Sequence, residues 1–233
     1  VIAGPDGRDP YISAAPLRDS RAIELAGLRV AWHSDNGIYT PTDEIRSVTE
    51  AAALSLGEAG AKLTEIVPPP IPDTNEALLR LFVWNDDGGE WIRRLLDAAG
   101  TETPSPAIAV QINPDLLLGG DVIVERIEAR DRFRAAMVAF MADYDVLVTP
   151  VTGFPAPPYG QAEDDALFPG YSYTQVYNLA GLPAAVVRCG TSPEGLPLGV
   201  QIAAPPWRED LALAVARHLE AEFGGWQAPP LGS

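Results

Sequence analysis

The chain has 233 residues, 47% of them hydrophobic, and no apolar run approaches the ~18 residues that a membrane span needs. Its 16 basic and 32 acidic residues give a formal charge of −16, a surface that repels phosphate backbones and anionic lipids. We therefore expect one globular domain with no nucleic acid and no membrane as partner. The single cysteine, Cys189, excludes an internal disulfide and fits a reducing, cytoplasmic compartment.

The first part of the chain predicts a strand, a helix and a second strand. Residues 28–32 and 62–67 have the composition of strands. Between them apolar residues recur at spacings of three and four, with Pro41 marking the start of a helix and Gly60 its end. Such a βαβ unit implies a right-handed crossover and a parallel strand pair.

The middle of the chain predicts mostly helix. Residues 73–100 have a helical pattern with a polar break, and residues 101–115 form a proline-rich linker. A long helix would begin at an N-cap Asp121 and carry apolar residues as far as Tyr144. It leads into residues 145–149, an apolar strand of the same sheet.

The last part predicts a long loop, a strand pair and a final helix. Residues 150–172 are rich in proline, and residues 178–183 have the composition of a turn. Strands are expected over 184–188 and 198–202, and an amphipathic helix over 208–223. The predicted fold class is α/β, with a mixed β-sheet covered by helices.

Three blocks of sequence resemble the amidase signature family. Residues 178–204, NLAGLPAAVVRCGTSPEGLPLGVQIAA, resemble its N-x-x-G-x-P turn followed by G-x-P-x-G-[VL]-Q. Residues 144–150 are similar to its D-x-[LI]-[LV]-x-P strand, and residues 4–10, GPDGRDP, strengthen the resemblance near the start of the chain. Three blocks in the right order are more specific than any one of them.

The resemblance also implies which residues this chain lacks. Family enzymes cut amides with a nucleophilic Ser, a second Ser whose peptide bond is cis, and a Lys, around a Gly/Ser-rich loop. No such loop occurs here, and the one lysine, Lys62, lies downstream of where the family places its own. We interpret residues 1–233 as one domain, the C-terminal portion of an amidase signature domain whose N-terminal half is missing. We assign it no catalytic residue.

Other catalytic patterns find no support in the residues. His33, Ser34 and Asp35 have the types of a hydrolase triad, but consecutive residues cannot converge on one reacting atom, so a polar loop is expected there. Cys189 is expected to be a small buried hydrophobe. Too few His and Cys residues occur for a structural zinc site, and no nucleotide-binding motif occurs. We predict no metal and no cofactor.

A substrate-binding wall is predicted where the long loop meets the turn. The loop begins at the carboxyl end of a predicted strand, where ligand crevices lie in open α/β sheets. Three tyrosines near its end, together with Trp84, would line an apolar cleft with polar tips, although they would serve equally to pack a helix against the sheet. The predicted wall consists of Thr149, Thr152, Tyr171, Tyr173, Tyr177 and Asn178.

Tyr171 bears on the substrate class. In the amidotransferase A subunits that take ammonia from glutamine, an Asp stands at this position and an Arg-rich segment lies on a preceding helix. Tyr171 and the arginine-free residues 110–114 imply a general amidase for a less polar small-molecule amide. A non-catalytic binding or scaffold module, or one subunit of a heteromeric amidase or amidotransferase, remains open. In each case we expect a missing N-terminal half or a partner chain, or a homodimer, to cover a bare apolar face.

Overall fold

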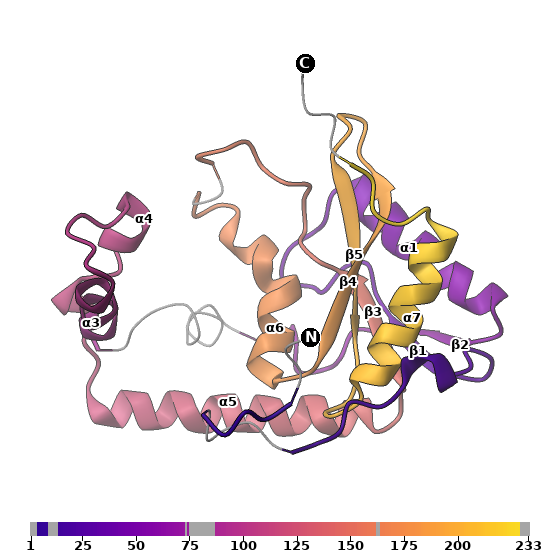
Figure 1. Ribbon diagram of the computed structural model, residues 1–233, viewed down its shortest axis with the longest axis horizontal. Helices are drawn as coiled ribbons and strands as arrows, with labels where there is room; N and C mark the ends of the chain where they lie inside the picture. Colours follow the sequence, from indigo (N-terminus) through magenta and orange to yellow (C-terminus); the bar gives the residue numbers. More distant parts are fainter. Residues whose placement is uncertain (1–3, 9–13, 73, 75–86, 162–163, 229–233) are drawn as a thin grey trace.

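The structure, a computed structural model, describes residues 4–8, 14–72, 74, 87–161 and 164–228. Its centre is a five-stranded sheet in the order β2-β1-β3-β5-β4 (Figure 1). The strands are β1 (Arg29–Trp32), β2 (Lys62–Glu65), β3 (Val146–Pro150), β4 (Ala184–Thr191) and β5 (Pro197–Ala203). β1 pairs in parallel with β2 and β3, whereas β5 runs antiparallel to both β3 and β4. The predicted mixed sheet and its parallel βαβ pair are confirmed.

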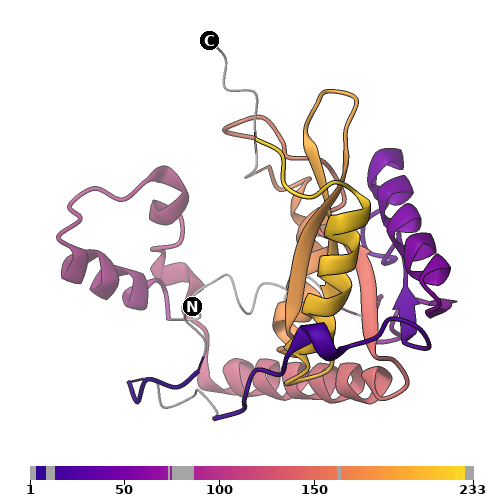
Figure 2. The ribbon, with the colours of Figure 1, turned by 45° about the vertical axis from the view of Figure 1, so that its right-hand side comes forward.

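Helices cover both faces of the sheet. The helices are α1 (Asp43–Glu58), α3 (Glu90–Ala99), α4 (Pro106–Ala109), α5 (Gly120–Met141), α6 (Ser172–Ala180) and α7 (Glu209–Glu222). α1 and α7 lie on one face, and α6 with the second half of α5 lies on the other (Figures 1 and 2). α3 and α4 lie at the far end of α5, away from the sheet, in both views. Among the described residues, no helix is long and apolar enough to cross a membrane.

The central strands are buried on both faces, which explains their continuous apolar sequence. Val30 and Val148 pack against α1 and α7 in one cluster. Their neighbours Ala31 and Leu147 point to the opposite face and pack against α5 and α6 in the other. Side chains that alternate along a strand therefore supply two separate cores from one sheet.

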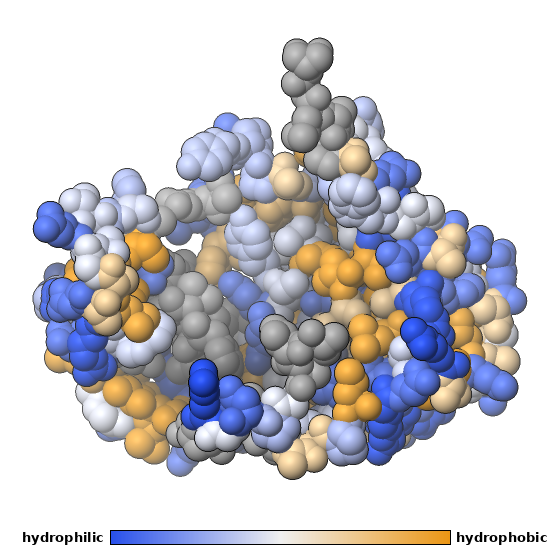
Figure 3. Space-filling model, in the orientation of Figure 1, coloured by the Kyte–Doolittle hydropathy of each residue, from blue (hydrophilic) through white to orange (hydrophobic). Residues whose placement is uncertain are grey.

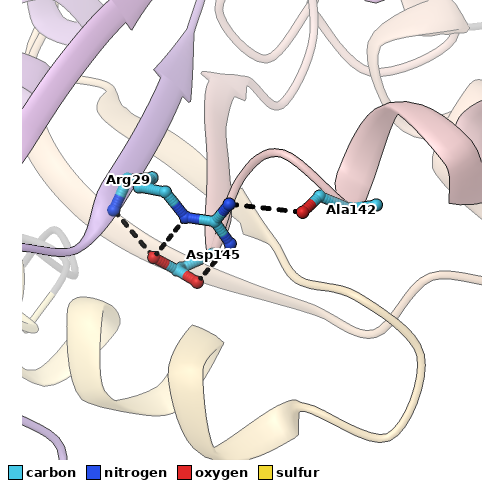
Figure 4. A network of polar contacts seen from close by, with 3 residues as sticks. All are labelled: Arg29, Ala142 and Asp145. Atoms are coloured by element: carbon cyan, nitrogen blue, oxygen red, sulfur yellow. Dashed lines mark hydrogen bonds and ion pairs between the residues drawn. The ribbon is translucent and has the colours of Figure 1, made fainter.

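An ion pair fixes the amino ends of β1 and β3 beside each other (Figure 4). The Arg29 guanidinium donates to both carboxylate oxygens of Asp145, at 2.9 and 3.3 Å, and to the Ala142 carbonyl at 3.2 Å. The backbone N–H of Arg29 donates to the same carboxylate at 2.8 Å. These hydrogen bonds hold the pKa of Asp145 below its ordinary value. The Asp of the resembled D-x-[LI]-[LV]-x-P block thus ties two strands together.

Several predicted boundaries were wrong. Residues 178–183 were expected to form a turn, but Asn178 is within α6, which continues to Ala180 and ends at Gly181, with a φ of 68°. The long loop ends earlier than expected, because a 3-10 turn occupies Phe168–Tyr171. α5 ends before Tyr144, at Met141. Trp84 and residues 73 and 75–86 of the helix expected over 73–100 lie outside the described residues; α3, from Glu90, forms its later part.

We expect a Gly181→Ala substitution to destabilise the fold by about 1–2 kcal/mol, because a Cβ disfavours the left-handed conformation that ends α6. Urea unfolding followed by circular dichroism measures this difference. The control is Gly120→Ala, at the first residue of α5, where a Cβ meets open space and φ is not in the left-handed region. Equal stabilities of the two variants would contradict the prediction.

Candidate functional site

The candidate site lies where the chain changes direction across the sheet. After β1 the chain passes through α1 to β2 on one side, and it later returns to β3 on the other side of β1. The carboxyl ends of β1 and β3 are therefore neighbours at a switch point, the place where open α/β sheets bind ligands. His33 follows β1 directly, and Thr149 is the penultimate residue of β3.

Three segments meet at this edge of the sheet, and we call them the rim. The rim consists of residues 33–42, 150–155 and 168–173. The backbone N–H of Thr42 donates to the Gly153 carbonyl at 2.9 Å, and the N–H of Gly153 donates to the Gly170 carbonyl at 3.0 Å. The middle segment is thereby hydrogen-bonded to both of its neighbours.

Aromatic rings pack across the rim. Phe154 lies edge-to-face with Tyr39, at 5.8 Å between ring centroids, and with Tyr171, at 5.3 Å. Such T-shaped pairs are favoured by the ring quadrupoles. A Cβ on Gly153 would clash with the Tyr39 ring, and one on Gly170 would clash with Phe154. Glycine at these two positions therefore lets the rings close against the backbone.

A buried asparagine and a buried tyrosine join the loop after β1 to the start of α6. The Asn36 side chain donates to the Ser172 hydroxyl at 2.8 Å and accepts from the N–H groups of Ile38, at 2.9 Å, and Tyr39, at 3.2 Å. The Tyr173 hydroxyl accepts from the N–H of Asn36 at 3.3 Å and donates to the Tyr39 carbonyl at 2.7 Å. Both side chains are fully buried, and the bonds from Asn36 to Ser172 and to Tyr173 form out of water.

A second polar network lies deeper, between α6 and the sheet. The Tyr177 hydroxyl is 3.2 Å from Nε2 of His33. The Gln201 side-chain amide donates to the Thr149 hydroxyl at 3.2 Å and to the Tyr173 carbonyl at 2.9 Å. Burial raises the pKa of the Tyr177 phenol, so it stays protonated at neutral pH. These bonds connect β1, β3 and β5 to α6.

The structure brings most of the predicted wall residues to this one edge. Thr149, Tyr173 and Tyr177 are buried within the two networks. Thr152 and Tyr171 are partly exposed on the rim, and Asn178 is exposed further along α6. Figure 1 shows α6 on the face of the sheet opposite α1 and α7.

Sequence reasoning missed several members of these networks, among them His33, Asn36 and Gln201. His33 was expected in an open polar loop, yet its side chain is 2% exposed. Asn36 had no signal beyond its turn-like neighbours, Asp35 and Gly37. Gln201 is the Gln of the G-x-P-x-G-[VL]-Q block. Its position as a polar residue in an otherwise apolar strand was the one sign in the sequence that it has a buried partner.

Other candidate nucleophiles and bases lie elsewhere. Cys189 is buried in the core beside α1 and α7, and burial raises the pKa of its thiol to about 12, so little reactive thiolate forms at neutral pH. Lys62 is exposed at the amino end of β2, the opposite end of the sheet from the rim. Within the described part of the chain, no three His, Cys, Asp or Glu side chains come together as a metal site requires.

We expect the stability of the chain to fall by about 3 kcal/mol between pH 6.5 and pH 4 because of His33. Burial lowers the pKa of His33 from 6.5 to about 4, so the unfolded chain binds a proton in this window that the folded chain does not. The stability is complete above pH 6.5 and is lost as the pH falls towards 4. Urea unfolding between pH 7 and pH 5 measures the slope.

A matched pair of variants identifies the histidine responsible. His33→Gln should flatten the slope, whereas His218→Gln, which changes the histidine that bonds Ser55 between α7 and α1, should keep it. A slope unchanged in His33→Gln would contradict the prediction.

Comparison of the sequence and the fold with known proteins identifies the family of this chain. The family model described as Amidase matches residues 1–213. The chain is 31% identical to an acylamidase of Rhodococcus erythropolis, over 95% of the chain and 48% of that protein. It is 29% identical to the A subunit of the glutamyl-tRNA(Gln) amidotransferase of Acidobacterium capsulatum, over 95% of the chain and 52% of that protein. It thus spans about half the length of these relatives.

Solved structures show the same fold. The structure of 6-aminohexanoate cyclic dimer hydrolase superposes with a TM-score of 0.77 at 20% identity, covering 91% of this chain and 48% of that one. The A subunit of the glutamyl-tRNA(Gln) amidotransferase from Thermotoga maritima gives a TM-score of 0.70 at 21% identity, covering 99% of this chain and 52% of that one. The family model, the relatives and the fold agree, and they show that this chain belongs to the amidase signature family.

Proposed function

We propose that this chain acts as the C-terminal half of an amidase, which hydrolyses the C–N bond of a carboxylic amide by acylating a serine and releasing the acyl group to water. The observation that supports it most is the family match over residues 1–213, in a chain half as long as its amidase relatives. In this proposal the serine nucleophile and its lysine base belong to the other half. This chain supplies part of the sheet and one wall of the substrate cleft.

The two edges of the sheet support a partner on β4. The β2 edge has four residues, with Lys62 and Glu65 exposed, features that discourage strand pairing. β4 is twice as long, and Ala184 and Val186 are exposed on its α6 side, Val186 by 55%. Figure 3 shows apolar surface near β4, to the right of the centre. The β4 edge is therefore the better place for the missing half to continue the sheet.

The rim is the proposed wall of the substrate cleft. Thr152 and Tyr171 are the wall residues on the rim with exposed surface, Asn178 is exposed further along α6, and the networks behind them contain Thr149, Tyr173 and Tyr177. Burial raises the pKa of Tyr171, so its phenol is neutral near pH 7 and offers a ligand an apolar ring with a polar tip. Such a wall suits an uncharged acyl group better than the ammonium group of glutamine.

The test is hydrolysis by the chain assembled with an N-terminal half that carries the family's Ser and Lys residues. We expect turnover of simple aryl and alkyl amides, a burst of the first product as the acyl-enzyme forms, and no turnover of glutamine. Binding of the two halves without turnover of any amide would contradict the enzymatic proposal and favour a scaffold role.

A second candidate is one component of an amidotransferase, because the chain is 29% identical to the A subunit of a glutamyl-tRNA(Gln) amidotransferase over 95% of its length. Tyr171 opposes glutamine as the ammonia donor, since it cannot pair with an ammonium group as a carboxylate does. Release of ammonia from glutamine in the same assay would select this second candidate.

A further inference from the structure

We propose that Tyr173 is a positioning residue that holds the loop after β1 against the start of α6 and thereby keeps the rim in place. The inference rests on the proposed function, in which the rim is the wall of the substrate cleft. Tyr173 itself is fully buried, so its contribution to the wall passes through the residues that it holds.

The Tyr173 hydroxyl satisfies two backbone groups of the loop after β1. It donates to the Tyr39 carbonyl at 2.7 Å and accepts from the N–H of Asn36 at 3.3 Å. Both bonds join positions more than 130 residues apart in the sequence, so no local turn could replace them. Removing the hydroxyl would leave the buried N–H of Asn36 and the part-buried carbonyl of Tyr39 without this partner, which is more costly than losing an ordinary hydrogen bond.

The backbone of the same residue is anchored to the sheet. The Gln201 amide on β5 donates to the Tyr173 carbonyl at 2.9 Å and to Thr149 on β3. Tyr173 therefore has its main chain fixed to β5 through Gln201, which also bonds β3, and its side chain fixed to the loop. Because Tyr173 is bonded on both sides, it holds the loop at a fixed place relative to the sheet.

The loop that Tyr173 holds carries part of the aromatic rim. Tyr39 packs on Phe154, and Phe154 packs on Tyr171, a wall residue with exposed surface. If the loop moved away from α6, Tyr39 would leave the edge of Phe154, and the packing that orients Tyr171 would weaken. A hydroxyl in the buried layer thus determines the shape of the exposed wall.

Tyr177 provides a matched contrast one helical turn later. It is buried to the same degree, and its hydroxyl contacts His33 Nε2 in the deeper network. No hydrogen bond of Tyr177 reaches Asn36 or Tyr39 among the bonds of the described residues. Tyr173→Phe and Tyr177→Phe therefore remove the same atom from the same helix, but only Tyr173 hydrogen-bonds to Asn36 and Tyr39, whereas Tyr177 contacts the loop only at His33, its first residue.

Hydrogen–deuterium exchange on the 233-residue chain tests whether Tyr173 holds the loop after β1 against α6, a role that we call the clamp. We expect exchange of the peptide covering residues 36–42 to be about tenfold faster in Tyr173→Phe than in the unchanged chain, the factor set by losing roughly 1.4 kcal/mol of local protection. In Tyr177→Phe the same peptide should exchange at its original rate, even where the melting temperature falls as much. Ser172→Ala, which removes the hydroxyl that accepts from Asn36, is the milder second variant, and it should accelerate the same peptide to a smaller extent.

The outcomes separate the clamp from the proposed function. Equal exchange of residues 36–42 in the two phenylalanine variants would overturn the clamp. In the assembled amidase, Tyr173→Phe should raise KM for an aryl amide about fivefold with kcat nearly unchanged, as loss of a positioned binding wall does. If the loop opens in Tyr173→Phe and KM stays the same, the clamp stands and the rim is not the wall, which contradicts that part of the proposed function instead.

Discussion

The isolated 233-residue chain should hydrolyse no amide above the uncatalysed rate. Amide cleavage needs an activated nucleophile and a base, and removing such a pair from a serine hydrolase costs on the order of a millionfold in rate. The described residues offer no replacement, because Cys189 is buried and Lys62 is exposed at the wrong end of the sheet. His33 is 2% exposed, so it is not accessible to a substrate at the surface.

The measurement is release of an aromatic amine from an aryl amide by the purified chain, beside a Lys62→Ala variant. Both proteins should match the buffer blank. Activity that disappears in Lys62→Ala would show that the lysine of this chain is a catalytic base after all. Activity that survives the substitution would show a nucleophile that neither sequence nor structure identified.

An N-terminal half of the family should bind this chain along β4 and raise its melting temperature. A ligand that binds only the folded form stabilises it by about 2.7 kcal/mol at one hundred times its dissociation constant. Val186→Lys places a charge on the exposed side of β4 and should weaken this binding by at least tenfold, because an unpaired charge would be buried at the contact.

The control substitution lies on the opposite edge of the sheet. Thr64→Lys changes an exposed residue of β2 and should leave binding unchanged. Isothermal titration and thermal melts measure both variants. Equal weakening by the two lysines would mean that charge, and not the β4 surface, controls the association.

Self-association through β4 would compete with binding of an N-terminal half. Without the other half, β4 of one copy can pair with β4 of a second across a two-fold axis, although a net charge of −16 on each copy opposes it. We expect a homodimer by light scattering at high salt, where this repulsion is screened, and we expect Val186→Lys to remove it. A monomer at every salt concentration, with no response to an N-terminal half, would favour a self-sufficient scaffold domain.

The elements that sequence predicted well are those with a strong local signal. α1 and α7 have apolar residues at helical spacing, and β3 is an apolar run buried on both faces. α6 was the main element missed, because its nine residues include Ser, Thr and Asn, which favour turns when judged alone. Burial of Tyr173 and Tyr177 against the sheet stabilises the helix in spite of these preferences.

By itself, the sequence determined the family, the α/β class and the absence of a Ser-rich loop, and it placed several of the proposed wall residues near one strand end. Those conclusions depend on residue identity and short-range spacing. Only the tertiary structure showed that His33, Asn36 and Gln201 meet Tyr173 and Tyr177. The reason is physical: a polar side chain in isolation can be solvated anywhere, and its partner is set by which segments the sheet brings together. The exposed side of β4 likewise depends on strand order. Val186 is exposed because β4 lies at the edge of the sheet, a position that the sequence alone does not give.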